Sequence, residues 1–193
     1  MIFDVSAYLN NDTSVKEIRE YPKYISSGIL LDEDMLYLLI VGDFVNKQQN
    51  KRVYLFTEKI KFDLKDFNYL VQFLRGFHTN FFITPHIFTK FIHLLWDNIN
   101  NENDYKEIIS IFSGTSEFIK EKHLDKKYFF EEENFKNKKW DIINSSLILT
   151  SQNHKHNTIL TCKWKTNNIC DKCGCLVIHY ENIKSAYLNN YFR

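Results

Sequence analysis

Short apolar runs alternate along the chain with longer segments that have the pattern of helices. The short runs have the length of buried strands and lie at residues 28–31, 80–84, 157–161 and 175–180. The longer segments are apolar throughout or repeat their apolar residues every three or four positions, and lie at residues 35–45, 64–77, 85–95, 103–122, 143–152, 165–172 and 181–188. Strands that alternate with helices favour a parallel sheet covered by helices. We therefore predict an α/β fold, an α/β/α sandwich with a central, mainly parallel sheet.

The pattern divides the chain into an extension and one domain. The 193 residues, 44% of them hydrophobic, suffice for a single core of ordinary size. Residues 1–27 are mixed and polar, with a short helix expected at 13–21, and we interpret them as an N-terminal extension that packs or docks on something else. Residues 28–193 form the predicted domain. Within it, the stretch at about 101–139 is a helical, charged insertion whose last part, 131–139, is an exposed connection.

Candidate residues stand where all four of the predicted strands end, which is where parallel sheets bind their ligands. These residues are Asp32, Thr84 with Pro85, Thr161 with Cys162, and His179, and the neighbouring Asp34, His86 and Lys163 are further candidates for this cleft. The two acids have two interpretations. They can cap and complement a helix that follows a buried strand, an effect worth about 1 kcal/mol. They can also supply the oxygen ligands that a hard divalent ion requires.

The stretch "LLDEDMLYLLIVGDF", at residues 30–44, resembles the opening of bacterial PIN domains. Three later stretches are similar to the next segments of a PIN-like subgroup, in the same order, and lie at residues 62–95, with Thr84-Pro85-His86, at 140–149 and at 157–188. The resemblance covers roughly residues 28–190 and implies a PIN-like α/β/α sandwich. In active members of that family, three or four carboxylates bind one or two Mg²⁺ or Mn²⁺ ions and cleave single-stranded RNA. Such ions activate water and stabilise the charge that develops on the phosphate.

The chain departs from the family pattern at three of the acidic positions, which fall on Lys90, Asn144 and Cys162. The resemblance therefore implies a degenerate PIN-like domain, a binding or scaffold subunit without nuclease activity. It would serve in an RNA-related, toxin–antitoxin-like or antiviral defence assembly, with a protein partner, RNA as a further ligand, and no cofactor. The alternative is an active Mg²⁺- or Mn²⁺-dependent endoribonuclease. It would use Asp32 and Asp34 as catalytic residues and metal ligands, with a third acid such as Asp141.

Several other polar residues keep two interpretations each. Lys90 is either a solvated lysine on a helix, or it replaces the charge of a metal ion by holding phosphate or pairing with Asp32. Cys162, Cys170, Cys173 and Cys175 include pairs at chelating spacing. The resemblance spreads them over a strand end, a helix and the next strand, so we expect ordinary cysteines rather than a zinc-stabilised module. The stretch "HKH", at residues 154–156, is interpreted as a loop turn rather than a metal clip.

Charge and hydropathy limit the classes of partner and the cellular location that we expect. The 25 basic and 24 acidic residues give a net charge of +1, which exerts no global attraction on nucleic acid or membranes. No apolar run reaches the roughly 18 residues of a membrane span. The first ten residues carry an acid where a signal peptide has basic residues. We therefore expect a cytoplasmic protein without membrane contact, whose four cysteines are thiols.

Overall fold

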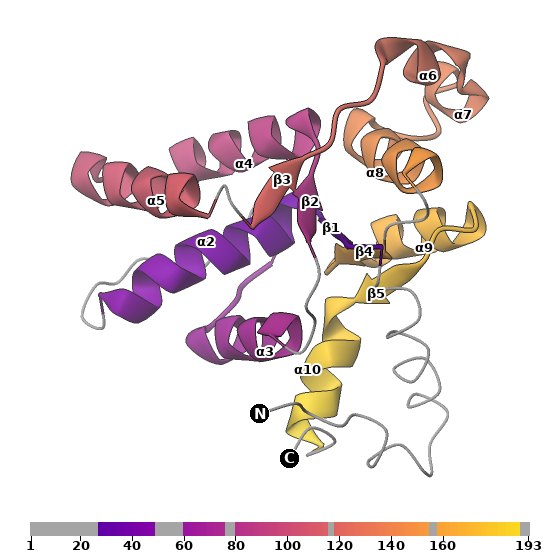
Figure 1. The fold of residues 1–193 in the computed structure, drawn as a ribbon. Helices are drawn as coiled ribbons and strands as arrows, with labels where there is room; N and C mark the ends of the chain where they lie inside the picture. The colour runs from indigo at the N-terminus through magenta and orange to yellow at the C-terminus, as the bar shows by residue number, and fades with distance from the viewer. Residues whose placement is uncertain (1–26, 49–59, 76–79, 116–117, 155–157, 190–193) are drawn as a thin grey trace.

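The computed structural model describes residues 27–48, 60–75, 80–115, 118–154 and 158–189. They form a five-stranded sheet in the order β3-β2-β1-β4-β5, in which all neighbouring strands are parallel. Its strands are β1 (Ile29–Leu31), β2 (Phe81–Ile83), β3 (Ile119–Glu121), β4 (Thr158–Thr161) and β5 (Val177–His179). Helices lie on both sides of the sheet (Figure 1). The predicted α/β/α sandwich with a parallel sheet is confirmed.

Nine helices are present in the described residues and connect the strands. They are α2 (Glu33–Lys47), α3 (Leu64–Arg75), α4 (Pro85–Asn98), α5 (Glu102–Gly114), α6 (Lys126–Glu131), α7 (Glu133–Lys136), α8 (Ile142–Asn153), α9 (Trp164–Lys172) and α10 (Tyr180–Leu188). Helix α2 packs against α3, α4 and α5, whereas α8 packs against α4, α6 and α9. The predicted helices at 35–45, 64–77, 85–95, 143–152, 165–172 and 181–188 correspond to α2, α3, α4, α8, α9 and α10.

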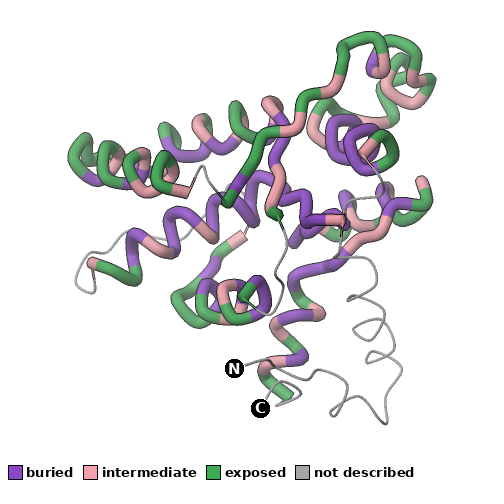
Figure 2. The backbone as a smooth tube through the Cα atoms, in the orientation of Figure 1, coloured by how far each residue is buried: buried purple, intermediate pink, exposed green. Residues whose placement is uncertain are grey.

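The core is centred on β1 and α2, which follow each other directly. All three residues of β1 are buried, as expected of a central strand that is covered on both faces. Helix α2 is buried along most of its length (Figure 2). Its Gly42 lets α3 approach closely, because a Cβ atom at that position would lie 2.4 Å from Cδ2 of Phe67. The strand–helix unit that was predicted from residues 28–45 is therefore the centre of the molecule.

One predicted element was wrong. The segment 103–122 was expected to be a single helix, but α5 ends at Gly114, and β3 begins at Ile119 and pairs with β2. Glycine is a poor helix former, so a helix ends there at little cost. In β3 only Ile119 is buried, and Lys120 and Glu121 are exposed. This short, charged edge strand lacks the apolar run by which the other strands were found. Part of the charged segment 101–139 thus belongs to the central sheet.

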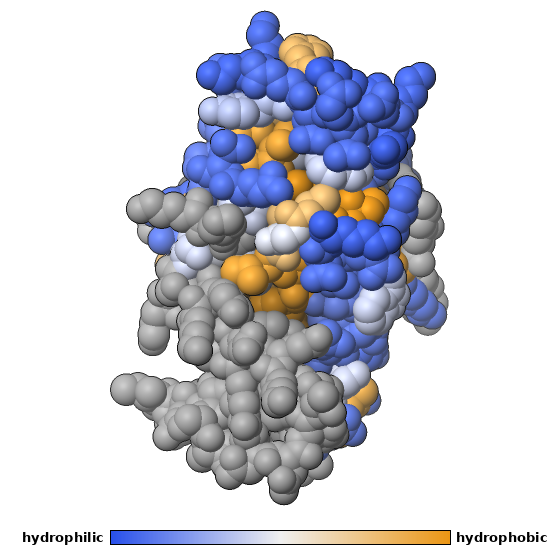
Figure 3. Space-filling view, turned by 90° about the vertical axis from the view of Figure 1, so that its right-hand side faces the viewer, coloured by the Kyte–Doolittle hydropathy of each residue, from blue (hydrophilic) through white to orange (hydrophobic). Residues whose placement is uncertain are grey.

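The expected exposed connection at 131–139 is confirmed. It is made by the end of α6, by α7, which has no buried residue, and by the turn before α8. Figure 3 looks at the right-hand side of Figure 1, and hydrophilic side chains cover its upper part, where α6 and α7 lie. The region therefore exposes a charged surface.

Two predicted segments, the N-terminal extension and the "HKH" turn, lie mostly outside the described residues. The N-terminal extension, with its helix at 13–21, lies almost entirely in residues 1–26, which are not described. Most of the "HKH" stretch lies in residues 155–157, which are not described either. Among the residues that are described, no helix is both long and apolar enough to cross a membrane.

Candidate functional site

Asp32 joins the first strand to the first helix of the core. It is the N-cap of α2, and its Oδ1 accepts a hydrogen bond from the backbone N–H of Met35 at 2.8 Å. Its own N–H donates to the carbonyl oxygen of Leu160 in β4 at 3.1 Å. The hydroxyl of Thr161 donates to Oδ2 at 2.5 Å. Both carboxylate oxygens of Asp32 therefore have a donor, and the capping interpretation is confirmed.

A carboxylate–lysine cluster, consisting of Asp32, Glu33, Asp34 and Lys163, lies at the carboxyl ends of β1 and β4. The three acids are buried, and none of them is more than 3% exposed. Lys163 Nζ forms an ion pair with Glu33 Oε1 and lies 3.0 Å from Asp34 Oδ2. The lysine side chain keeps 29% of its surface exposed. The buried charge of α2's first turn is thus partly balanced by Lys163, a cation that follows β4 far along the chain.

Cys162 lies beside the same cluster, and its thiol is 3.8 Å from Asp34 Oδ2 as a hydrogen-bond donor. Ligand atoms of Asp32, Asp34 and Cys162 all lie within 4.8 Å of one another. No other group of three histidine, cysteine or acidic residues comes that close in the described parts of the chain. The structure therefore brings Asp32, Asp34, Cys162 and Lys163 together, as four of the predicted site residues.

Burial shapes the protonation of the cluster. It raises the pKa of Asp32 to about 8, with further increases from Glu33 and Asp34, while Lys163 and the Thr161 hydroxyl act in the opposite direction. Burial lowers the pKa of Lys163, but attraction by the three acids outweighs it, so the net pKa is raised and the amine stays charged. Burial and the nearby carboxylates raise the pKa of Cys162 far above its ordinary value. At neutral pH the thiol is therefore protonated.

The raised pKa of Asp32 predicts a pH-dependent effect of Asp32→Asn. Between the ordinary pKa near 3.8 and about 8, the folded protein keeps a proton that the unfolded chain releases, so stability falls as pH rises. Asparagine has no such proton, and it keeps an acceptor for the Met35 N–H. We expect the difference in free energy of unfolding, variant minus wild type, to rise by about 1 kcal/mol for each pH unit between roughly pH 5 and pH 8. Urea denaturation across this range measures it, and parallel pH profiles of the two proteins would contradict it.

Three other predicted site residues have their described contacts at the junction of α4 with α6 and α8. Thr84 is the N-cap of α4, and its Oγ1 lies 3.1 Å from Oγ of Ser146 in α8. The ring of His86 lies 5.1 Å from the ring of Phe129 in α6, and burial lowers its pKa. Asn144 Nδ2 donates to Asp141 Oδ2 at 2.9 Å. These side chains organise the packing of helices near the strand ends.

The structure also gives the positions of Asp141 and Lys90, for which the sequence left more than one role. Asp141 is the N-cap of α8, and its two oxygens accept from the N–H and the side-chain amide of Asn144. It does not belong to the group of ligand atoms formed by Asp32, Asp34 and Cys162. Lys90 is half-buried in α4, and its pairing with Asp32 stays a prediction. The lysine that pairs with Glu33 and Asp34 is Lys163.

The other three cysteines lie at the end of α9 and the start of the segment that leads to β5. The N–H groups of Cys173 and Cys175 both donate to the carbonyl oxygen of Cys170, at 3.1 and 3.0 Å. All four cysteines are free thiols, and Cys170 and Cys175 are buried. Cys162 differs from them in that its thiol donates a hydrogen bond to Asp34 in the carboxylate–lysine cluster.

Sequence reasoning missed Glu33 and the stacking of Trp164. Glu33 stands in the first helical turn, where an acid is ordinarily exposed and complements the helix dipole. Trp164 is 57% exposed, and its indole stacks on the buried ring of His179 with centroids 3.7 Å apart. His179 in turn caps α10, since its Nδ1 accepts from the N–H of Glu181 at 3.3 Å. Neither contact has a local signal, because the partner of Glu33 lies 130 residues away and the stacking of Trp164 depends on the position of His179 at the end of β5.

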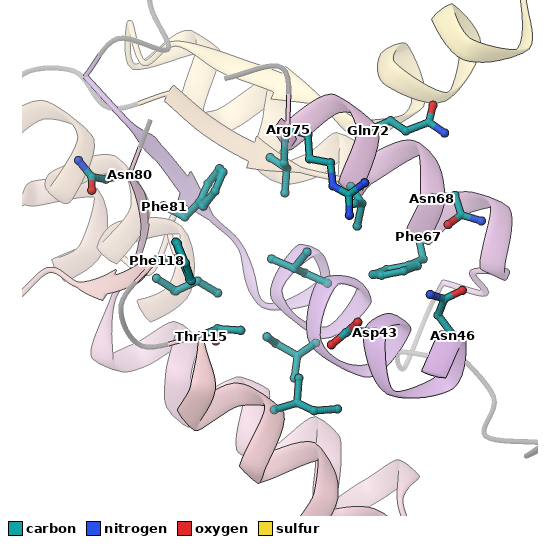
Figure 4. A pocket seen from close by; sticks show the side chains of 16 residues that line it. Asp43, Asn46, Phe67, Asn68, Gln72, Arg75, Asn80, Phe81, Thr115 and Phe118 are labelled. Atoms are coloured by element: carbon teal, nitrogen blue, oxygen red, sulfur yellow. The ribbon is translucent and has the colours of Figure 1, made fainter. Parts of the chain in front are cut away.

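A pocket of about 800 Å³ lies at the other end of the strands, where β2 and β3 begin. It is lined by apolar side chains of α2, α3 and α5, by the first residues of β2 and β3, and by polar residues such as Asp43, Gln72 and Arg75. Figure 4 shows the labelled side chains around this one space. Since all strands are parallel, their beginnings lie away from the ends that carry the carboxylate–lysine cluster. The pocket and the cluster are therefore separate places.

The fold and the site together define an α/β/α protein with a buried carboxylate–lysine cluster at the carboxyl ends of its central strands. Comparisons with protein-family models, with curated proteins and with solved structures give no match for this chain. Its function is therefore inferred from the geometry above.

Proposed function

We propose that this chain is a PIN-like domain that does not cleave RNA and that acts as a binding or scaffold subunit. The observation that carries this proposal is the position of Lys163, whose ammonium group pairs with Glu33 and lies 3.0 Å from Asp34. In a metal-dependent nuclease of this kind, the carboxylates at this strand end hold the catalytic ion. Here the ammonium group of Lys163 already pairs with two of the carboxylates, those of Glu33 and Asp34.

The residues present do not suit Mg²⁺ or Mn²⁺. Mg²⁺ requires near-octahedral oxygen coordination, and both oxygens of Asp32 already accept hydrogen bonds from Met35 and Thr161. The third neighbour is the protonated thiol of Cys162, a poor ligand for hard ions. Lys163 also repels a second cation at this distance. The site therefore lacks the oxygen ligands on which hydrolysis by a hard metal ion depends.

A binding role agrees with the exposed side chain of Trp164, which lies near the carboxyl end of β4. Trp164 follows Lys163 directly and exposes more than half of its surface, although its ring is already stacked on His179. Exposed tryptophan is enriched where proteins contact partners. We propose a protein as the partner, with RNA as a further ligand of the subunit.

The second candidate is an active Mg²⁺- or Mn²⁺-dependent endoribonuclease. It is favoured by the closeness of Asp32 and Asp34, whose ligand atoms lie within 4.8 Å of each other and of Cys162. In that case Asp32 and Asp34 would hold the ion, with Glu33 rather than Asp141 as the third nearby acid.

An RNA-cleavage assay separates the two candidates. We expect the wild type to leave single-stranded RNA intact in Mg²⁺ or Mn²⁺, with no more cleavage than Asp32→Asn or Asp34→Asn. Cleavage by the wild type that depends on Mn²⁺ and disappears in Asp32→Asn would replace the proposed function by the second candidate.

Co-purification from the protein's own cells tests the binding role. We expect a defined partner with the wild type and less of the same partner with Trp164→Ala. A wild-type protein that purifies alone, without protein or RNA, would contradict a binding or scaffold function.

A further inference from the structure

The ligand atoms beside Lys163 are of a mixed kind that differs from an all-oxygen site. Two carboxylates and one thiol, from Asp32, Asp34 and Cys162, lie within 4.8 Å of one another, and all three residues are buried. Asp34 and Cys162 come from different elements and already face each other, with Sγ 3.8 Å from Oδ2. A set of three convergent donors with one sulfur is typical of sites for Zn²⁺ and related ions.

A second, independent observation is a buried oxygen of the cluster that lacks a hydrogen-bond partner. Glu33 is 3% exposed, and its Oε2 is buried without a hydrogen-bond partner. Its other oxygen pairs with Lys163, which also contacts Asp34, so this unpartnered oxygen belongs to the same cluster. A buried carboxylate oxygen without a partner is energetically costly, and a nearby metal ion would reduce that cost.

We propose that Asp32, Asp34 and Cys162 bind a divalent ion of the Zn²⁺ class, with Glu33 as the neighbouring acid that stabilises it. The inference goes beyond the proposed function, which concerns Mg²⁺ and Mn²⁺, and does not depend on it. Binding breaks the S–H bond of Cys162 and removes the proton that Asp32 holds at neutral pH, forms metal–sulfur and metal–oxygen bonds, and releases both protons to solvent. No electron is transferred.

The discrimination between ions comes from the sulfur of Cys162, since every divalent ion is repelled alike by Lys163. Lys163 can keep its pair with Glu33, which is outside the ligand set, when Asp34 turns to the metal. Mn²⁺ stands at the weak end of the series of divalent ions for a given set of ligands, and Mg²⁺ gains nothing from sulfur. Zn²⁺ and Co²⁺ bind more strongly and gain a thiolate bond. Only an ion that gains the thiolate bond therefore offsets the repulsion by Lys163.

Cobalt absorption on the full chain tests the site. Co²⁺ serves as the probe because a thiolate ligand gives it a sulfur-to-metal charge-transfer band in the near ultraviolet. We expect the wild type, with its thiols reduced, to develop this band at one Co²⁺ per chain, and Zn²⁺ but not Mg²⁺ to abolish it. Cys162→Ser should remove the band, and Asp34→Asn should weaken Co²⁺ binding by about tenfold or more.

Cys173→Ser is the matched control, because Cys173 is the most exposed of the other three cysteines. It should keep the band. A band that persists in Cys162→Ser and disappears in Cys173→Ser would overturn the proposal in favour of the cysteines at the end of α9. A wild type without any band would overturn it as well, even if Cys162→Ser failed to fold. Neither result bears on RNA cleavage in Mg²⁺ or Mn²⁺, so the proposed function is tested separately.

Discussion

Replacing Lys163 by methionine is expected to lower the free energy of unfolding by about 3 kcal/mol at neutral pH. The methionine retains most of the apolar stem but removes the charge that pairs with Glu33 and lies 3.0 Å from Asp34. Two carboxylates, whose side chains are each only 4% exposed, are then left without a cation. Removing one partner of a buried ion pair costs more than the pair itself is worth, because the other charge stays desolvated. Urea denaturation at about pH 7 measures the loss.

Lys165→Met is the matched control, since Lys165 is exposed two residues further along. Its effect should stay within about 0.5 kcal/mol. If Lys163→Met and Lys165→Met are equally stable, the ion pairs of Lys163 contribute nothing and its role in the proposed function is refuted.

Gly42→Ala is expected to destabilise the protein by about 2 kcal/mol, although alanine is the better helix former. The added Cβ would lie 2.4 Å from Cδ2 of the Phe67 ring and 3.0 Å from the Phe67 Cβ. Phe67 is buried and sits on α3, so the ring cannot leave without moving that helix away from α2. The overpacking therefore exceeds the gain of about 1 kcal/mol in helix propensity. Thermal or urea unfolding measures the difference.

Gly114→Ala provides the control for this effect. No atom lies within 4 Å of a Cβ at Gly114, so the substitution should leave stability unchanged or raise it by up to about 1 kcal/mol. The double variant Gly42→Ala/Phe67→Leu should lose less than the sum of the two single variants, because leucine vacates the space that the new Cβ requires. Strict additivity of the two changes, or a stabilised Gly42→Ala, would contradict close packing between α2 and α3.

The fold was largely predictable because its central elements have strong local signals. β1 is an uninterrupted apolar run, and α4 begins with Thr84 as N-cap and Pro85 in the first turn, as the sequence indicates. β3 was missed because an edge strand of three residues with two charged side chains buries only Ile119. Its place is decided by pairing with β2, which no local pattern reports.

The candidate site was predictable in position but only partly in composition. Asp32 and Cys162 were expected near each other because both follow parallel strands, and β1 and β4 do lie side by side. The pairing of Lys163 with Glu33 could not be read from the sequence, because it depends on the directions of two side chains that leave different strand ends. The PIN-like resemblance remains a proposal that rests on the quoted segments and on the arrangement of the site.

The pairing of β1 with β4 also determines when the charges of α2 can be neutralised. Thr161 and Asp32 are 129 residues apart in the sequence, and Lys163 and Glu33 are 130 apart. During synthesis, the apolar helix α2 and its three leading acids therefore emerge well before the lysine that balances them. Contacts of such long sequence separation form late and slow folding. We expect an incomplete chain that stops before Lys163 to expose α2 with uncompensated acids at its start, which makes the segment from Lys163 onward a condition for burying α2.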